Sequence, residues 1–143
     1  MYQKVTIVGN LGSDPEMRYT PSGQAVTNFS VATNRRWTGS DGQAQEETVW
    51  FRVSVWGRTA ETCNQYLSKG QRVLCEGRLR ADESGNPRVW QDQSGNWRAS
   101  YELNAFEVKF LGQRGGDGGG SFDSGADNAP SGDPGITEDE IPF

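Results

Sequence analysis

Histidine is absent from this sequence of 143 residues, which contains only two cysteines. Without histidine the chain lacks the commonest general base and a common zinc ligand, which excludes Ser-His-Asp triads and histidine-containing zinc sites. Cys63 and Cys75 are too few for a zinc cluster, their spacing matches no thiol-redox motif, and their apolar neighbours indicate reduced thiols in a core. The acidic residues are scattered, with no spacing that pairs carboxylates or a nucleophile with a base. We therefore predict no enzymatic activity, no catalytic residues, no metal and no cofactor.

Long apolar runs are also missing. No segment approaches the roughly 20 apolar residues that a membrane-spanning helix requires. The first residues, MYQKVTIVG, lack the charged and then apolar pattern of a secretion signal. We expect a cytoplasmic protein with no membrane partner.

Positive charge is in the minority, since 14 Lys and Arg against 19 Asp and Glu give a net charge of -5. The acidity lies at one end, because residues 1–112 carry 13 basic and 12 acidic residues, whereas residues 113–143 carry 1 basic and 7 acidic residues. The composition changes there to mostly Gly, Ser, Asp, Asn, Ala and Pro, which bury too little apolar surface to offset the entropy of ordering. We predict a folded domain over 1–112, a flexible linker over 113–135 and a distinct tip over 136–143.

Within the predicted domain, apolar residues alternate with the period of two that is typical of strands. Turn-forming clusters separate five predicted strands, over residues 4–11, 25–37, 48–57, 71–80 and 97–111. A helix is predicted over 58–69, with Ala60, Cys63 and Leu67 on one face and Gly70 as its C-terminal stop. Five strands with one helix between the third and fourth indicate an all-β protein, a five-stranded OB-fold barrel, followed by a disordered C-terminal tail.

The third predicted strand has two faces of different character. One face is apolar and consists of Val49, Phe51, Val53 and Val55. The opposite face consists of Trp50, Arg52, Ser54 and Trp56. Flat rings alternating with arginine suit a platform on which unpaired bases stack while arginine contacts phosphate. A long loop or a subunit interface that covers the rings would explain this face equally well.

More tryptophan and arginine residues favour the nucleic-acid interpretation. Arg35, Arg36 and Trp37 end the second predicted strand, and Arg88 and Trp90 precede the fifth. Inward positions of the fourth predicted strand are Val73, Cys75 and Leu79, and its outward positions are Arg72, Arg78 and Arg80. A basic stripe beside several tryptophans on a nearly neutral domain indicates binding of single-stranded nucleic acid. Protein–protein hot spots are enriched in the same residue types, so a protein-interaction surface is an alternative.

Short motifs extend in register along nearly the whole of residues 1–112. They are VGNLG at 8–12, DPEMRY at 14–19, FSVAT at 29–33, WFRV at 50–53, YLSKG at 66–70 and EGRLR at 76–80, with DEIPF at 139–143. Together they resemble the bacterial-type single-stranded DNA-binding protein family. The resemblance implies an OB barrel, normally a homotetramer, that wraps single-stranded DNA during replication, recombination and repair, and hence a nucleoid-associated protein.

The resemblance also assigns roles to residues by motif position. It implies base stacking by four tryptophans, Trp37, Trp50, Trp56 and Trp90. Phosphate contacts are implied for Arg18, Arg52, Arg58, Lys69 and Arg80, and the basic stripe adds Arg35, Arg36, Arg78 and Arg88. Residues 81–87 depart from the family pattern as an insertion with two acids. Trp97 has no family counterpart, and we expect it to pack against the hairpin or a neighbouring subunit rather than to contact DNA.

The tip, ITEDEIPF, places acidic residues beside apolar ones. One interpretation is an acidic brush that improves solubility. An apolar anchor and a terminal carboxylate preceded by acids would instead suit a hydrophobic pocket with a basic rim on a partner. The resemblance implies docking of replication, recombination and repair proteins through Asp139, Glu140, Ile141, Pro142 and Phe143.

Two other binding functions compete with this assignment. A protein-interaction OB module, such as a replication-restart adaptor, would use the tryptophan-rich face for a protein. A cold-shock-type barrel would bind RNA, although its chain would be shorter and the tip would have no explanation. Quenching of tryptophan fluorescence by oligo(dT), and competition between DNA and RNA, distinguish the three.

Overall fold

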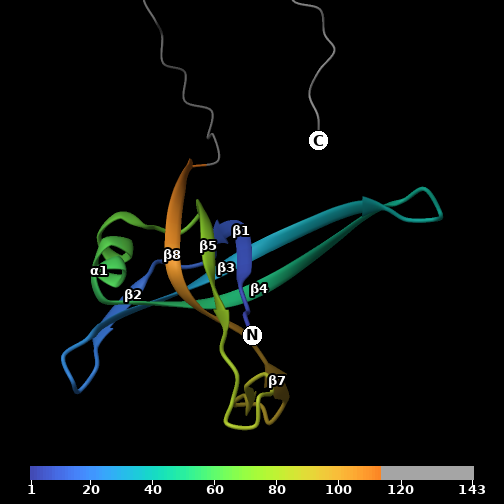
Figure 1. Ribbon diagram of the computed structural model, residues 1–143. Helices are drawn as coiled ribbons and strands as arrows, with labels where there is room; N and C mark the ends of the chain where they lie inside the picture. Colours follow the sequence, from blue (N-terminus) through green and yellow to red (C-terminus); the bar gives the residue numbers. More distant parts are fainter. Residues whose placement is uncertain (114–143) are drawn as a thin grey trace, which may run out of the picture.

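Five strands close into a barrel in the computed structural model, which describes residues 1–113 (Figure 1). The barrel strands are β1 (Val5–Leu11), β3 (Ala25–Thr38), β4 (Ala44–Trp56), β5 (Gln71–Leu79) and β8 (Tyr101–Gln113). Neighbouring strands follow the order β1-β5-β8-β4-β3, and β3 pairs with β1 to close the cylinder. Strands β4 and β8 are parallel, whereas the other neighbours are antiparallel. Helix α1 (Gly57–Tyr66) joins β4 to β5, so the predicted OB-fold barrel is confirmed.

The barrel is filled by side chains from alternate positions of its strands. Fully buried members of this core are Val31, Val53, Val55, Val73 and Leu103. The helix packs against the barrel through Ala60 and Cys63, and the Thr27 hydroxyl donates a 2.7 Å hydrogen bond to the Ala60 carbonyl. Val49 and Phe51 are only partly buried, because β4 leaves the barrel at that end. The inward face of β4 is therefore occupied by the core, and its outward face is available for binding.

Both cysteines belong to this core. Cys63 and Cys75 are fully buried and unpaired. Burial raises the pKa of the Cys63 thiol to about 11 and that of the Cys75 thiol to about 12, so both stay protonated at neutral pH. The prediction of core thiols is confirmed.

Glycine allows the backbones to approach closely where strands meet in the barrel. A Cβ at Gly9 of β1 would overlap the carbonyl of Ala32 in β3, and a Cβ at Gly77 of β5 would overlap the backbone of Asn104 in β8. Both positions therefore require a residue without a side chain.

The last predicted strand is interrupted at Ser100. Strand β7 (Trp97–Ala99) pairs with β6 (Val89–Gln91) in a separate two-stranded sheet, and β8 begins only at Tyr101. The N–H of Ser100 donates to the carbonyl of Arg88 at 3.4 Å, which draws this segment away from the barrel. The prediction of one continuous strand over 97–111 is therefore wrong.

Three smaller features also differ from the sequence prediction. Helix α1 ends at Tyr66, because Leu67 adopts extended dihedrals of φ -89° and ψ 146°, and Gly70 instead turns the chain toward β5 at φ +88°. Leu79 is exposed rather than buried, because β1 begins at Val5 opposite Gly77 and leaves the end of β5 without a β1 neighbour. Strand β2 (Glu16–Tyr19), which the sequence pattern does not predict, pairs with the outer edge of β3.

Two segments leave the barrel (Figure 1). Beyond Asn34 and Thr48, β3 and β4 pair only with each other as far as Thr38 and Ala44, and residues 34–48 are here termed the ribbon. The second segment connects β5 to β8, contains the β6–β7 hairpin and is termed the arm (residues 81–100).

The arm contains two copies of the turn sequence D-x-S-G-N, at residues 82–86 and 92–96. In each copy the aspartate Oδ1 accepts hydrogen bonds from the backbone N–H groups two and four residues later, at 2.8–2.9 Å. The insertion at 81–87 thus repeats the turn of the β6–β7 hairpin.

Candidate nucleic-acid interface

The outward face of β4 carries two exposed rings with a guanidinium between them. Trp50 is 53% exposed, Trp56 is 39% exposed, and the intervening Arg52 is also exposed. Ser54 is buried, because its hydroxyl donates a 2.6 Å hydrogen bond to the Asn28 Oδ1 on the neighbouring strand β3. Six residues of extended strand separate the two tryptophans by about 20 Å. In residues 1–113 no loop hides these rings, so this part of the surface is open to a ligand.

Trp50 is supported from the loop that follows β1. Its ring lies so close to Gly12 that a Cβ at Gly12 would overlap it. The Gly12 N–H donates a 3.0 Å hydrogen bond to the carbonyl of Ser30, which ties this loop to β3. A depression of about 300 Å³ borders the ring and is lined in part by Asp14, Phe29 and Ser100. The ring is therefore held in place beside open space.

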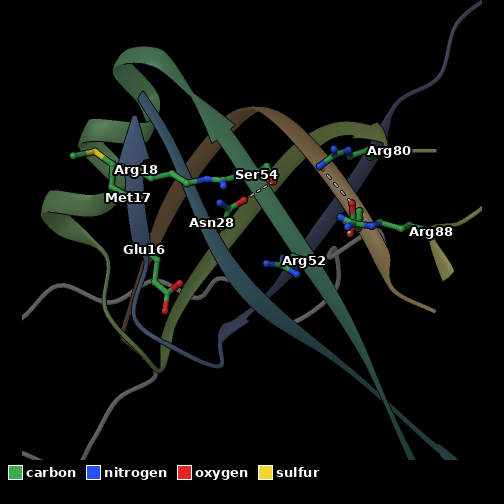
Figure 2. Close-up of a pocket in the computed structure, with 9 residues that line it drawn as sticks. Glu16, Met17, Arg18, Asn28, Arg52, Ser54, Arg80 and Arg88 are labelled. Atoms are coloured by element: carbon green, nitrogen blue, oxygen red, sulfur yellow. Dashed lines mark hydrogen bonds and ion pairs between the residues drawn. The ribbon is translucent and has the colours of Figure 1, made fainter. Parts of the chain in front are cut away.

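A second depression, of about 280 Å³, lies beside the segment of β4 between Trp50 and Trp56 (Figure 2). Four arginines line it, and they come from four different parts of the chain: Arg18 from β2, Arg52 from β4, Arg80 after β5 and Arg88 from the arm. This depression is termed the arginine pocket. The four arginines are separate predictions from the sequence, and the fold brings them to one place.

Glu102 of β8 also lines the arginine pocket and was not predicted from the sequence as a site residue. Only 6% of its side chain is exposed, and its carboxylate forms ion pairs with Arg80, at 3.6 Å, and with Arg88, at 3.8 Å (Figure 2). The backbone N–H of Arg80 also donates to the Glu102 carbonyl at 2.8 Å. The available signal was alternation, since Glu102 adjoins the inward residue Leu103 and so had to face outward. Its position opposite Arg52 follows only from the parallel register of β4 and β8 in the structure.

The arm carries two further tryptophans, Trp90 and Trp97. The Nε1 of Trp90 donates a 3.3 Å hydrogen bond to the Ser100 hydroxyl, and Ser100 also borders the depression beside Trp50. Trp90 is thereby connected to the surface around Trp50. Trp97 is 72% exposed in the single chain, so its packing against a neighbouring subunit stays a prediction. It pairs with Gln91, on the face of the two-stranded sheet opposite Trp90.

The predicted residues of the ribbon form a separate group outside the arginine pocket. Trp37 is exposed, and the Arg35 guanidinium lies 5.0 Å from its ring centroid, within the range of a cation–π contact. The Nε of Arg36 pairs with the Glu46 carboxylate at 3.2 Å. These three predicted residues therefore interact mainly within the ribbon.

The three remaining residues that were predicted to contact phosphate also lie outside the arginine pocket. Arg58 is exposed in the first turn of α1, and Arg78 is exposed on the outer surface of β5 opposite Asn104. Lys69 precedes β5, and its backbone N–H donates a 2.8 Å hydrogen bond to Asp14, which borders the Trp50 depression. Arg58, Lys69 and Arg78 thus contribute positive charge around the barrel.

The remaining predictions concern the residues after 113, a membrane-spanning helix and a metal site. The predicted tip residues, 139–143, lie outside the described residues, as does nearly all of the predicted linker. Within residues 1–113 no helix has the length and apolarity needed to cross a membrane. In the same residues no three Cys, Asp or Glu side chains are grouped so as to hold a metal ion.

Comparison with known proteins agrees with this geometry. The Single-strand binding protein family matches residues 2–111. A single-stranded DNA-binding protein of Wolinella succinogenes is 40% identical over the full length of both chains, and one of Neisseria meningitidis is 42% identical over 82% of this chain and 64% of its own. Among solved structures, a deletion mutant of the single-stranded DNA binding protein from Thermus aquaticus matches with a TM-score of 0.61 at 32% identity, over 78% of this chain and 51% of that one. The Plasmodium falciparum SSB in complex with ssDNA matches with a TM-score of 0.64 at 25% identity, over 78% of this chain and 96% of that one.

These matches also show whether the chain belongs to a class of enzymes. The matched family consists of non-enzymatic DNA-binding proteins, which confirms the prediction that the chain is not an enzyme. The barrel, its exposed tryptophans and the match over residues 2–111 lead to one assignment: the chain belongs to the Single-strand binding protein family.

Proposed function

We propose that this protein binds single-stranded DNA without sequence preference, along the outward face of β4. The observation that carries the proposal is the order of groups on that face, where the arginine pocket lies between Trp50 and Trp56. Every base has a π-face that can stack on tryptophan, with about 1–3 kcal/mol per base and little discrimination among bases. The arginines would neutralise backbone phosphates and release counterions. Membership of the family supports this assignment.

The other predicted residues would extend the path of the strand. Trp90 would continue stacking beside Trp50, and Trp37 would add a platform on the ribbon. Phosphate contacts are proposed for the four arginines of the arginine pocket and for the basic residues around it, Arg35, Arg36, Arg58, Lys69 and Arg78. Binding energy would then be distributed over many groups.

Titration of intrinsic tryptophan fluorescence with oligo(dT) tests the proposal. We expect strong quenching on binding, and an affinity that falls steeply as salt rises because counterions are released. Competition with RNA oligomers and duplex DNA should leave the single-stranded DNA complex largely intact. An absence of quenching, or stronger binding of RNA, would contradict the proposal and favour a protein-interaction or RNA-binding barrel.

We further propose that the protein acts as a homotetramer that protects single-stranded DNA during replication, recombination and repair. Its place in the cell would then be the nucleoid-associated cytoplasm. The single-stranded DNA-binding protein of Wolinella succinogenes matches this chain over the full length of both, which supports the same role for this protein. Light scattering of the full chain, alone and with oligo(dT), measures the mass of the assembly, and a monomer under both conditions would contradict this assignment.

The tip over residues 136–143 is proposed to dock replication, recombination and repair proteins. Its acids next to Ile141, Pro142 and Phe143 suit an apolar pocket with a basic rim. Deletion of residues 136–143 should abolish capture of such partners and leave DNA affinity equal or slightly higher, because an acidic segment competes with DNA for the basic face and salt screens that competition. Capture that is unchanged by the deletion would mean that the tip only improves solubility.

A further inference from the structure

A buried acid lies in the part of the surface where an anion would bind. Glu102 lines the arginine pocket with 6% of its side chain exposed, and by charge alone it would repel a phosphate. A buried carboxylate is also costly unless cations compensate it. We therefore expect Glu102 to make a favourable contribution to binding that is larger than its repulsion of phosphate.

The two ion pairs of Glu102 leave most of each guanidinium available. Arg80 and Arg88 each approach the carboxylate through one Nη1, and their side chains are 51% and 59% exposed. A guanidinium has five N–H donors, so either arginine can hold the carboxylate and contact a phosphate at the same time. Glu102 thus restrains the two arginines without occupying them fully.

The same ion pairs join the arm to the barrel. Arg80 immediately precedes the arm, and Arg88 follows the first of its two D-x-S-G-N turns. The second turn is followed at the equivalent position by Arg98, which pairs with Asp92 of its own turn at 2.9 Å. Of these two equivalent arginines, Arg88 reaches the barrel and Arg98 does not. Arg88, the residue directly after the insertion, therefore connects the arm to Glu102.

We propose that Glu102 is a positioning residue, which orders Arg80 and Arg88 for phosphate contact and docks the arm beside the bound strand. This inference rests on the proposed binding of single-stranded DNA. If the two long side chains are already ordered in the free protein, they lose less conformational entropy when DNA binds. The gain exceeds the repulsion between the carboxylate and the strand, because the two guanidiniums offset its charge.

Glu102→Gln tests the proposal, because electrostatics and positioning predict opposite signs. If the acid only repels DNA, its removal strengthens binding to oligo(dT). If it positions the arginines, we expect affinity at about 0.1 M salt to fall by about tenfold, and the slope of log K against log salt to become shallower by about 1.4 for two lost phosphate contacts. A variant that binds as tightly as the wild type, or more tightly, would overturn the inference.

Glu16→Gln is the matched control. Glu16 lines the same pocket, but its side chain is exposed and in Figure 2 points away from the arginines. Removal of this charge should leave affinity unchanged or slightly higher, whereas a loss equal to that of Glu102→Gln would overturn the assignment to Glu102. If the wild type fails to bind oligo(dT), the proposed function itself fails. If the wild type binds oligo(dT) and the Glu102→Gln variant binds it with undiminished affinity, the proposed function stands and only the positioning role is refuted.

Arg88→Gln separates positioning from a general loss of stability. If Glu102 acts through Arg88, the double variant should bind only slightly less tightly than Glu102→Gln, and losses that add fully would overturn the inference. Protease cleavage within residues 81–100 should accelerate in both single variants, because each undocks the arm. Should Glu102→Gln not fold, Glu102→Asp keeps the charge but shortens its reach, and it should show the same direction of change in salt slope. An unchanged slope in a folded Glu102→Asp variant would refute the role.

Discussion

Arginines lie near tryptophans in two regions of this molecule, the ribbon and the outward surface of the barrel that carries the arginine pocket, but different groups hold the arginines. In the ribbon, Arg36 pairs with Glu46, whose side chain is 45% exposed. In the arginine pocket, Arg80 and Arg88 pair with Glu102, of which only 6% is exposed. An exposed ion pair contributes about 0–1 kcal/mol and competes with water. A buried carboxylate has no such alternative, so it restrains its partners more firmly. The positioning role proposed for Glu102 therefore depends on the burial of this acid, not on the presence of an acid alone.

The tryptophans of the two regions differ in the same way. Trp50 lies against Gly12 on a barrel strand that is paired on both sides. Trp37 lies on a two-stranded ribbon, where its ring contacts the exposed side chain of Arg35. Isolated two-stranded ribbons are only marginally stable. We therefore expect the barrel surface to dominate binding and the ribbon to adjust to the strand.

The largest effect on binding should come from Trp50→Ala. Loss of its stacking should weaken oligo(dT) binding by about 10- to 100-fold, which corresponds to about 1–3 kcal/mol. Fluorescence-independent titration, such as anisotropy of labelled oligo(dT), measures this change. Trp97→Ala removes a more exposed ring away from the pocket and should have little effect. Complete loss of binding in a folded Trp50→Ala variant would contradict the distributed binding proposed here.

Gly12→Ala should weaken binding by a smaller factor, because it tilts the ring without removing it. A Cβ at this position would overlap the Trp50 ring. We expect affinity to fall by about three- to tenfold, within the energy that one stacked base contributes. In the Trp50→Ala background the same substitution should have no further effect. If it did, Gly12 would act on the loop rather than on the ring.

Trp37→Ala should have a weaker effect again. Its platform lies on the ribbon, where ordering of the strand and the ribbon offsets part of the stacking energy, so we expect a loss of about two- to fivefold, at the lower end of the range for one base. A loss as large as that of Trp50→Ala would show that the ribbon is as well ordered as the barrel and would break the comparison.

The barrel was predictable from the sequence because local patterns determine it. Period-two alternation identifies the five barrel strands, and the apolar face of the third strand corresponds to core residues such as Val53 and Val55. The interruption at Ser100 was not predictable in this way, since no turn-forming cluster separates β7 from β8, and only the pairing of β7 with β6 shows that it leaves the barrel. The repeated D-x-S-G-N turn was a visible signal of that excursion, because two turns ten residues apart leave room for a hairpin.

The site was predictable as a set of residue types, but not as an arrangement. Trp50 and Trp56 are exposed as the alternation requires. The convergence of Arg18, Arg52, Arg80 and Arg88 depends on pairings between β2, β3, β4 and β8, which a single sequence does not reveal. Glu102 was missed for the same reason, since an acid in a strand has meaning only once its neighbours across the sheet are known.

Glu46→Gln provides the smallest effect and the sharpest contrast with Glu102. The Glu46 carboxylate accepts a 3.0 Å hydrogen bond from Asn34 and pairs with Arg36, but it is nearly half exposed. Its restraint on Arg36 is therefore weak, and its main effect on DNA is repulsion. Removal of the charge should strengthen oligo(dT) binding by about two- to threefold at low salt, a gain that about 0.5 M salt should largely abolish by screening. The same substitution at Glu102 should weaken binding. If Glu46→Gln also weakened it, an exposed acid would position arginine as well as a buried one, and the distinction between the two regions would fail.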